Sequence, residues 1–329
     1  MPSTSSLVFS RLYLPRPLDT SAVAAFLTRL ASDKDAPRVA LELRADQDGG
    51  VRHLLGCPAT DVQALRRLLR DLLPGSLLTR PAPHNAPVRP DVEVAGRLRV
   101  QPRSLPLRTD APEATTRALL SAMAVPLKVG EVAVLQVVLG PRRSPRVVPA
   151  NVPDPGTTLV DALTRGDRPA SSETRARLRE RFSQAGFAAT IRIGAASPDR
   201  GRRRRFVTSL LGALSTVQSP GVQLALIRQP APHLNDVRMP WRWPLHLGIT
   251  ELVGLLGWPI GEGDLPGLPP AHPKPLRPAS GVHTGTRVFA RSAVPGDDRV
   301  IGISPKDQTF HAVAYGPSGS GKTNALLHL

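Results

Sequence analysis

Residues 311–323 read HAVAYGPSGSGKT, and this stretch decides the fold of the C-terminal part of the chain. Five residues with the pattern of a short buried strand lead into a loop that has glycine at positions 316, 319 and 321, followed by Lys322 and Thr323. The loop matches G-x-x-x-x-G-K-[ST], in which glycines let successive backbone N–H groups point into one concavity that holds phosphate oxygens. The order of strand, loop and apolar helix is the order that this motif requires. The stretch therefore predicts a nucleotide-binding site.

Each residue of this phosphate-binding loop has an expected role. Lys322 would reach the β- and γ-phosphates of ATP, and the hydroxyl of Thr323 would bind Mg²⁺, so these two are the candidate catalytic residues. The full set expected to bind the nucleotide is Gly316, Pro317, Ser318, Gly319, Ser320, Gly321, Lys322, Thr323 and Asn324. The alternative is a chance match in a Gly- and Ser-rich turn, which the scarcity of lysine in this chain disfavours.

Further groups are needed for ATP hydrolysis, and they normally follow the loop in the chain. They are an acidic residue on a second strand, a group that orients water and an arginine from a neighbouring subunit. The sequence ends at Leu329. We therefore expect it to be an N-terminal fragment of an ATPase, inactive by itself.

The chain is strongly basic, with a formal net charge of +17, and nearly all of its 43 basic residues are arginines. Such a charge suits a partner that carries phosphates, such as DNA. The alternative cause is the composition that a GC-rich genome imposes on its proteins, and the sequence leaves both open.

Cysteine content and hydropathy predict the cellular compartment. Cys57 is the only cysteine, which excludes an internal disulfide and a cysteine-cluster metal site and favours a reducing compartment. The start of the chain lacks a signal-peptide pattern. The most apolar stretch, residues 252–260, is far shorter than the ~20 residues of a spanning helix. We expect a cytoplasmic protein without a transmembrane segment, at most peripheral at the inner face of the cell membrane.

Hydrophobic periodicity divides the rest of the chain. Residues 1–82 show the order β-α-β-β-α-β of a ferredoxin-like module, with Asp19 as the cap of the first helix. Residues 88–229 repeat this order, with a loop and a helix inserted at 141–185. Residues 230–286 are proline-rich and predict a linker with one short helix. The fold class expected is thus α+β for the two tandem modules and α/β for residues 287–329, the start of a RecA-like P-loop NTPase domain.

The densest charge cluster, here called the arginine cluster, comprises Arg200, Arg202, Arg203, Arg204 and Arg205. It follows a predicted helix start with Ser197 as N-cap and Pro198 at the first position. Cations there oppose the helix dipole, so a nucleic-acid phosphate is one candidate partner. The interpretation we favour is a solvated arginine face on a helix whose other side packs inward.

A tryptophan-containing triplet and the histidines are further candidates for binding sites. The triplet Trp241-Arg242-Trp243 could stack on bases, but two tryptophans in a proline-rich segment more often anchor one domain on another, which is the reading we favour. The histidines are dispersed, with no spacing typical of a metal site.

A family resemblance rests on the residues before the loop. Val288-Phe289-Ala290, residues 295–299, Gly302-Ile303 and His311, together with the loop itself, resemble the start of the motor domain in actinobacterial ATPases of the VirD4/TraG coupling-protein and HerA/FtsK-like superfamily. Residues 251–259 and 265–270 also look like the segment that leads into that domain, so the resemblance covers about residues 240–329.

The resemblance implies a RecA-like motor that forms hexameric rings and uses ATP to move DNA at a conjugation or type IV secretion channel. Lys322 and Thr323 carry over as the phosphate and Mg²⁺ residues. The acidic second motif and the arginine finger of the family have no counterpart in these residues, and neither do the membrane helices of many coupling proteins. Two other hypotheses remain: a protein-interaction scaffold with a nucleotide switch, and an unrelated P-loop kinase or GTPase.

Overall fold

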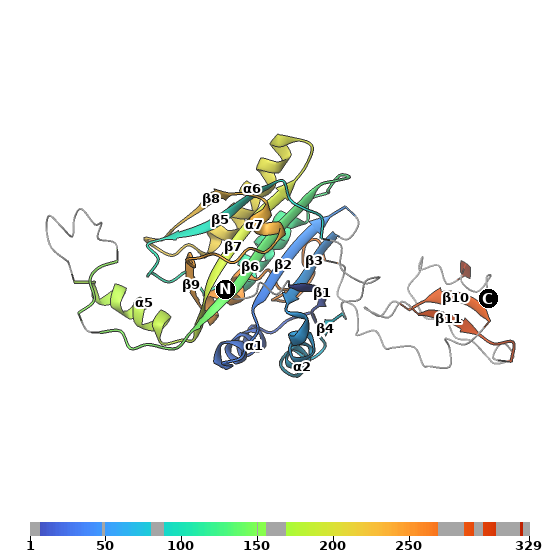
Figure 1. Cartoon of the computed structure of the whole chain (residues 1–329), viewed down its shortest axis with the longest axis horizontal. Coiled ribbons are helices and arrows are strands. Elements are labelled where there is room, and N and C mark those ends of the chain that lie inside the picture. The colour runs from blue at the N-terminus through green and yellow to red at the C-terminus, as the bar shows by residue number, and fades with distance from the viewer. Residues whose placement is uncertain are drawn as a thin grey trace. The chain divides into compact units, whose positions relative to one another are not determined.

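The chain forms two compact units in a computed structural model, residues Met1–Ala271 and His272–Leu329 (Figure 1). The structure describes residues 7–47, 50–79, 89–149, 151–155, 169–268, 286–292, 299–306 and 323–324. Each unit is considered by itself below.

Strands of the first unit make one α+β fold around a single antiparallel sheet. Among the described residues the sheet has nine strands, in the order β4-β1-β3-β2-β6-β7-β5-β8, with β9 beside β7 (Figure 1). The strands are β1 Val8–Tyr13, β2 Val39–Asp46, β3 Gly50–Cys57, β4 Leu77–Leu78, β5 Val94–Gln101, β6 Val132–Arg143, β7 Gly186–Ala196, β8 Gln223–Gln229 and β9 Leu245–Gly248. The two halves of the sheet meet where β2 pairs with β6.

Six of the described helices lie on one face of this sheet and bury a shared core. They are α1 Thr20–Ser32, α2 Val62–Leu72, α3 Pro112–Met123, α5 Ser172–Phe182, α6 Arg200–Leu214 and α8 Ile249–Leu255. The short helix α7 Pro232–Asn235 lies on the opposite face. The largest core cluster joins Phe26 of α1 and Leu119 of α3 to Leu41 and Leu135 of the central strands. The predicted cap of α1 is confirmed, because the Asp19 carboxylate accepts a hydrogen bond from the backbone N–H of Ser21.

The opposite face of the sheet carries a buried polar network where its halves meet. Glu42 of β2 lies opposite Gln136 of β6, which lies opposite Arg192 of β7. The Glu42 carboxylate accepts hydrogen bonds from Arg44 Nε at 2.8 Å, Arg89 Nη2 at 2.7 Å and Gln136 Nε2 at 2.8 Å. Gln136 in turn accepts from Arg192 Nη1 at 2.8 Å. A one-residue slip of β2 against β6 would turn these side chains into the apolar core, so the network specifies the register.

The neighbours of Glu42 and Arg192 shift the pKa values of these two buried side chains. Burial alone would raise the pKa of Glu42, but the hydrogen bond from Arg89 and the positive charges of Arg44 and Arg89 outweigh burial and lower it. Burial, followed by the charge of Arg97, lowers the pKa of Arg192 to about 10. The carboxylate of Glu42 is therefore ionised at neutral pH and balances part of the buried positive charge.

Residues 231–243 cover this second face. Leu234 packs with the strand residues Ala95 and Val134, and Val237 packs with Phe9 and Val138. Trp243 is half-buried and lies against Gly140, where a Cβ atom would come within 2.4 Å of the indole ring. By contrast, Trp241 is 95% exposed. Trp243 is thus a packing anchor within the first unit, whereas Trp241 makes no such anchor.

Part of the proline-rich segment is integral to the first unit. The predicted short helix is observed as α8, but the prediction of a single helix is wrong, because α7 also lies in this segment, and β9 adds a strand that the sequence did not predict. β5 pairs with residues 192–195 of β7, and β9 pairs with residues 186–189 of the same strand. The two short pairings therefore lie one after the other along β7. Trp258 is 1% exposed and its ring lies 5.7 Å from that of Phe26 in α1.

In the second unit, β10 Arg287–Arg291 pairs with β11 Val300–Ile303 in an antiparallel hairpin. The expected strand at 311–315, the loop residues 316–322 and residues 295–298 of the family resemblance lie outside the described residues. Over the part of the chain that is described, no helix combines the length and apolar character needed to cross a membrane.

Candidate functional site

The start of α6 positions the arginine cluster, and it differs from the sequence prediction. The N-cap is Asp199, whose carboxylate accepts hydrogen bonds from the backbone N–H groups of Gly201 at 2.7 Å and Arg202 at 3.4 Å. The prediction of Ser197 as N-cap, with Pro198 opening the helix, is therefore wrong. The Ser197 hydroxyl is buried and donates to Glu131 at 2.8 Å, so it is engaged elsewhere.

Arg202 is held by a buried carboxylate. Its guanidinium forms a bidentate pair with Glu131, with Nη2 2.6 Å from Oε2. Glu131 also accepts a hydrogen bond from the backbone N–H of Lys128 at 2.8 Å. The bond from Arg202 is the main cause that lowers the pKa of Glu131 to about 2. Arg202 therefore attaches α6 to the sheet and is not free to meet a ligand.

The other four arginines of the cluster divide further. Arg203 forms an ion pair with Glu93, just before β5. Arg200, Arg204 and Arg205 are exposed and make no ion pair with a carboxylate of the described residues. The opposite side of the helix packs inward through Phe206, Leu210 and Leu214. The cluster thus combines two structural arginines with three that face solvent.

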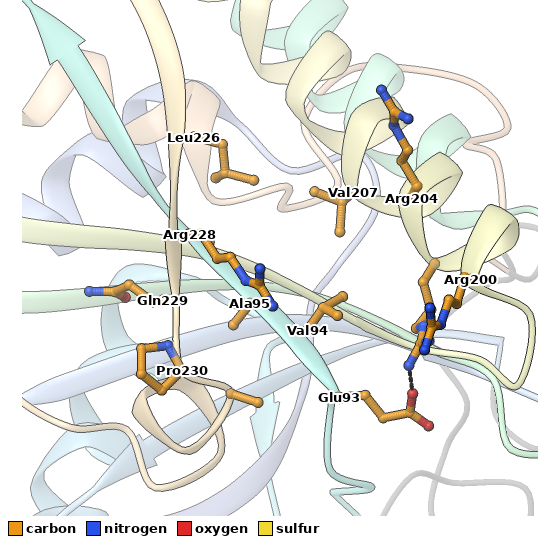
Figure 2. Close-up of a pocket in the computed structure, with 13 residues that line it drawn as sticks. Glu93, Val94, Ala95, Arg200, Arg204, Val207, Leu226, Arg228, Gln229 and Pro230 are labelled. Carbon is orange, nitrogen blue, oxygen red and sulfur yellow. Dashed lines mark hydrogen bonds and ion pairs between the residues drawn. The ribbon is translucent and has the colours of Figure 1, made fainter.

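A groove runs between α6 and the strands β5 and β8 (Figure 2). It has a volume of about 1040 Å³. Its apolar lining includes Val94, Val207 and Leu226. Its cations are Arg200, Arg203 and Arg204 from α6 and Arg228 from β8, and the only carboxylate among the lining residues is Glu93. Arg205 does not line it, so the groove separates side chains that are adjacent in sequence.

Sequence reasoning missed Arg228 and Glu93. Arg228 stands alone on a strand 23 residues after Arg205, and only the pairing of β8 with β5 brings it near the helix. Glu93 precedes β5 by one residue, so no local pattern links it to α6. The alternation of apolar residues predicts the strands β5 and β8, but it does not predict which of their side chains lie next to α6.

The described residues contain neither a candidate metal site nor a reactive thiol. Within those ranges, no group of three or more His, Cys, Asp or Glu side chains could hold a metal ion. Cys57 is buried, and burial raises the pKa of its thiol to about 12, so it is a poor nucleophile.

Only the last residue of the predicted phosphate-binding loop, Thr323, lies among the described residues. Thr323 and Asn324 are helical and exposed, and residues 316–322 lie outside the described ranges. No protein-family model matches this sequence, and no curated protein matches it with significance.

Proposed function

We propose that this chain belongs to an ATP-binding motor of the VirD4/TraG and HerA/FtsK-like kind, which moves DNA in conjugation or type IV secretion. The observation that carries the proposal is the sequence of residues 316–323, whose last residue, Thr323, is helical and exposed together with Asn324. Backbone N–H groups of the loop and Lys322 would bind the phosphates. Thr323 would bind Mg²⁺, which offsets the negative charge of the phosphates.

We further infer the domain organisation that the sequence predicts. Two ferredoxin-like modules, residues 1–82 and 88–229, would stand in tandem before a RecA-like domain that starts at 287. The strand orders β4-β1-β3-β2 and β8-β5-β7-β6 support the two modules, because each is the order of a β-α-β-β-α-β unit with its first and third strands in the centre. The hairpin β10–β11 would begin the RecA-like domain.

In this proposal the first unit is an accessory or assembly module of a hexameric ring. DNA, other copies of the chain and the secretion or conjugation machinery would be its partners. The net charge of +17 supports a partner with phosphates. The protein would act in the cytoplasm, at most peripherally at the inner face of the membrane. Since Arg202 and Arg203 are paired with carboxylates, a contact with DNA through the arginine cluster would be limited to Arg200, Arg204 and Arg205.

The decisive experiment measures nucleotide binding by the full chain and its Lys322→Ala variant. We expect a fluorescent ATP analogue with Mg²⁺ to bind the wild type and to bind Lys322→Ala at least ~10-fold more weakly, because a charge-assisted phosphate contact is lost. Lys306→Ala removes an exposed lysine of the same unit and serves as the control. Equal binding by the wild type and both variants would refute the nucleotide site.

A second measurement separates the motor from its rivals. ATP hydrolysis is followed, with and without double-stranded DNA, for a protein that carries this chain together with the acidic motif and the arginine finger expected of the motor, and stimulation by DNA supports the motor. Binding of ATP without any stimulation would favour the scaffold with a nucleotide switch, which the large first unit makes a coherent second candidate. Preference for GTP over ATP would favour the unrelated GTPase.

A further inference from the structure

Among the described strands, none pairs with the outer edge of β8. β8 is the last strand in the sheet order, and among the described strands it pairs with β5 alone. It is seven residues long, whereas the strand at the other edge, β4, has two residues. The unpaired N–H and C=O groups along such an edge form a template for an added strand, and proteins usually shorten the edge strand or cover it with another element.

The groove beside this edge has an apolar floor. Leu226 of β8 lies over Gly96 of β5, where a Cβ atom would come within 2.4 Å of the Leu226 side chain. Val94 and Val207 are half-buried next to it. Figure 2 shows Val207 and Leu226 facing the same space between the helix and the strands. Apolar side chains of an added strand would find partners here.

The rim of the groove is cationic. Glu93 is the one carboxylate among its lining residues, and its ion pair with Arg203 neutralises both. Arg200, Arg204 and Arg228 have no carboxylate partner among the described residues. The N-terminus of α6 adds its partial positive charge. A partner for this rim must therefore be acidic.

We propose that the β8 edge and this groove form a docking site for an extended acidic segment of a partner protein, which adds to the sheet as a strand next to β8. Backbone hydrogen bonds to β8 provide affinity, and the alternation of a strand presents apolar side chains to the floor and carboxylates to the arginines. Nucleic acid satisfies the arginines but leaves the backbone edge unpaired, so the peptide fits both features. The proposal does not depend on the nucleotide loop.

Selection of peptides on the full chain tests the composition of the partner. A phage library of random peptides, each long enough to span the seven residues of β8, is selected on the wild type and counter-selected on a variant with Arg200→Ser, Arg204→Ser and Arg228→Ser. We expect enriched peptides in which Asp or Glu alternates with apolar residues. Absence of enrichment, or enriched peptides without acidic residues, would overturn the proposal.

Single variants then test the site. Arg204→Ser and Arg228→Ser should each weaken binding of a selected peptide by about tenfold, the loss of one charge-assisted contact. Arg205→Ser removes the same charge from the same helix outside the groove and should change binding by less than about twofold. An equal loss in all three variants would show general charge attraction and contradict docking in the groove.

Hydrogen exchange distinguishes strand addition from nucleic-acid binding. The peptide should slow amide exchange within residues 223–229, because outward N–H groups of β8 become hydrogen-bonded. Single-stranded oligothymidine should not. Protection of β8 by the oligonucleotide instead of the peptide would assign the groove to nucleic acid and refute the proposal.

Discussion

The two halves of the sheet have the same strand order but differ in their edge strands and in the helix that packs beside them. In the first half, α2 buries Val62, Leu65 and Leu69, starting at its first residue, and the edge strand β4 is two residues long. In the second half, α6 begins with arginines and buries nothing before Phe206, and the edge strand β8 has seven residues. The same topology thus yields a short edge in one half and a groove beside a longer edge in the other. The difference lies in the residues that one helix presents to the sheet.

The largest effect is expected where the halves are joined. Glu42→Ala leaves the buried Arg44 and the half-buried Arg89 without their carboxylate, and removal of one partner from a buried pair costs about 3–5 kcal/mol. We expect the free energy of unfolding, measured with urea, to fall by this amount. Glu262→Ala, at an exposed glutamate, is the control and should be neutral. Equal stability of the two variants would mean that the network does not hold the halves together.

A matched pair of substitutions tests the contrast between α2 and α6. Leu65→Ala removes a side chain that is 1% exposed and should cost about 2–5 kcal/mol in the free energy of unfolding. Val207→Ala trims a half-buried residue that lines the groove and should cost less than about 1 kcal/mol. If Val207→Ala destabilised the protein as much as Leu65→Ala does, the second half would be as closed as the first.

The attachment of α6 should depend on pH. The pKa of Glu131 is about 2 in the folded chain, below the ordinary value of 4.5. A lowered pKa in the folded state stabilises the protein above the ordinary value, and this contribution is lost as the pH falls from 4.5 through about 2. The stability advantage of the wild type over Glu131→Gln should therefore shrink over this range. A constant difference between pH 6 and pH 2 would contradict the assignment.

The smallest effects concern the segment that covers the second face of both halves. Trp241 is 95% exposed, so Trp241→Ala should change the free energy of unfolding by less than about 0.5 kcal/mol. Trp243→Ala removes the ring that packs against Gly140 and should cost more. Thermal unfolding of the two variants measures the difference, and a reversed order would place the anchor at Trp241.

Periodicity alone predicted most elements of the first unit. Residues 7–79 gave the order of strands and helices and the Asp19 cap, because alternation and helical spacing reflect one buried face. The same rule could not foresee the network at Glu42, since polar residues that alternate with leucines read as a solvent-facing side. Their burial comes from residues 231–243, far away in the sequence. For the same reason β9, a four-residue strand among prolines, was missed.

The candidate sites show a related limit. The loop at 316–323 can be recognised from the sequence because all of its motif residues are adjacent in the chain. Its binding of a nucleotide remains a prediction. The sequence predicted the arginine cluster as a concentration of charge but not its division, because Glu131 and Glu93 reach α6 from positions just before β6 and β5. The Ser197 cap failed because Asp199, nearer to the first turn, offers a charged acceptor to two backbone N–H groups.

The pairing of β2 with β6 has a consequence for assembly. Each is the second strand of its half, and they run antiparallel with Glu42 opposite Gln136, so an approximate two-fold axis passes near this pair. The chain thereby contains, in one polypeptide, the kind of self-complementary contact that joins identical subunits in a symmetric dimer. This internal symmetry occupies the second-strand edge of both halves, so among the described strands a further copy or partner can extend the sheet only next to β4, β8 or the short strand β9.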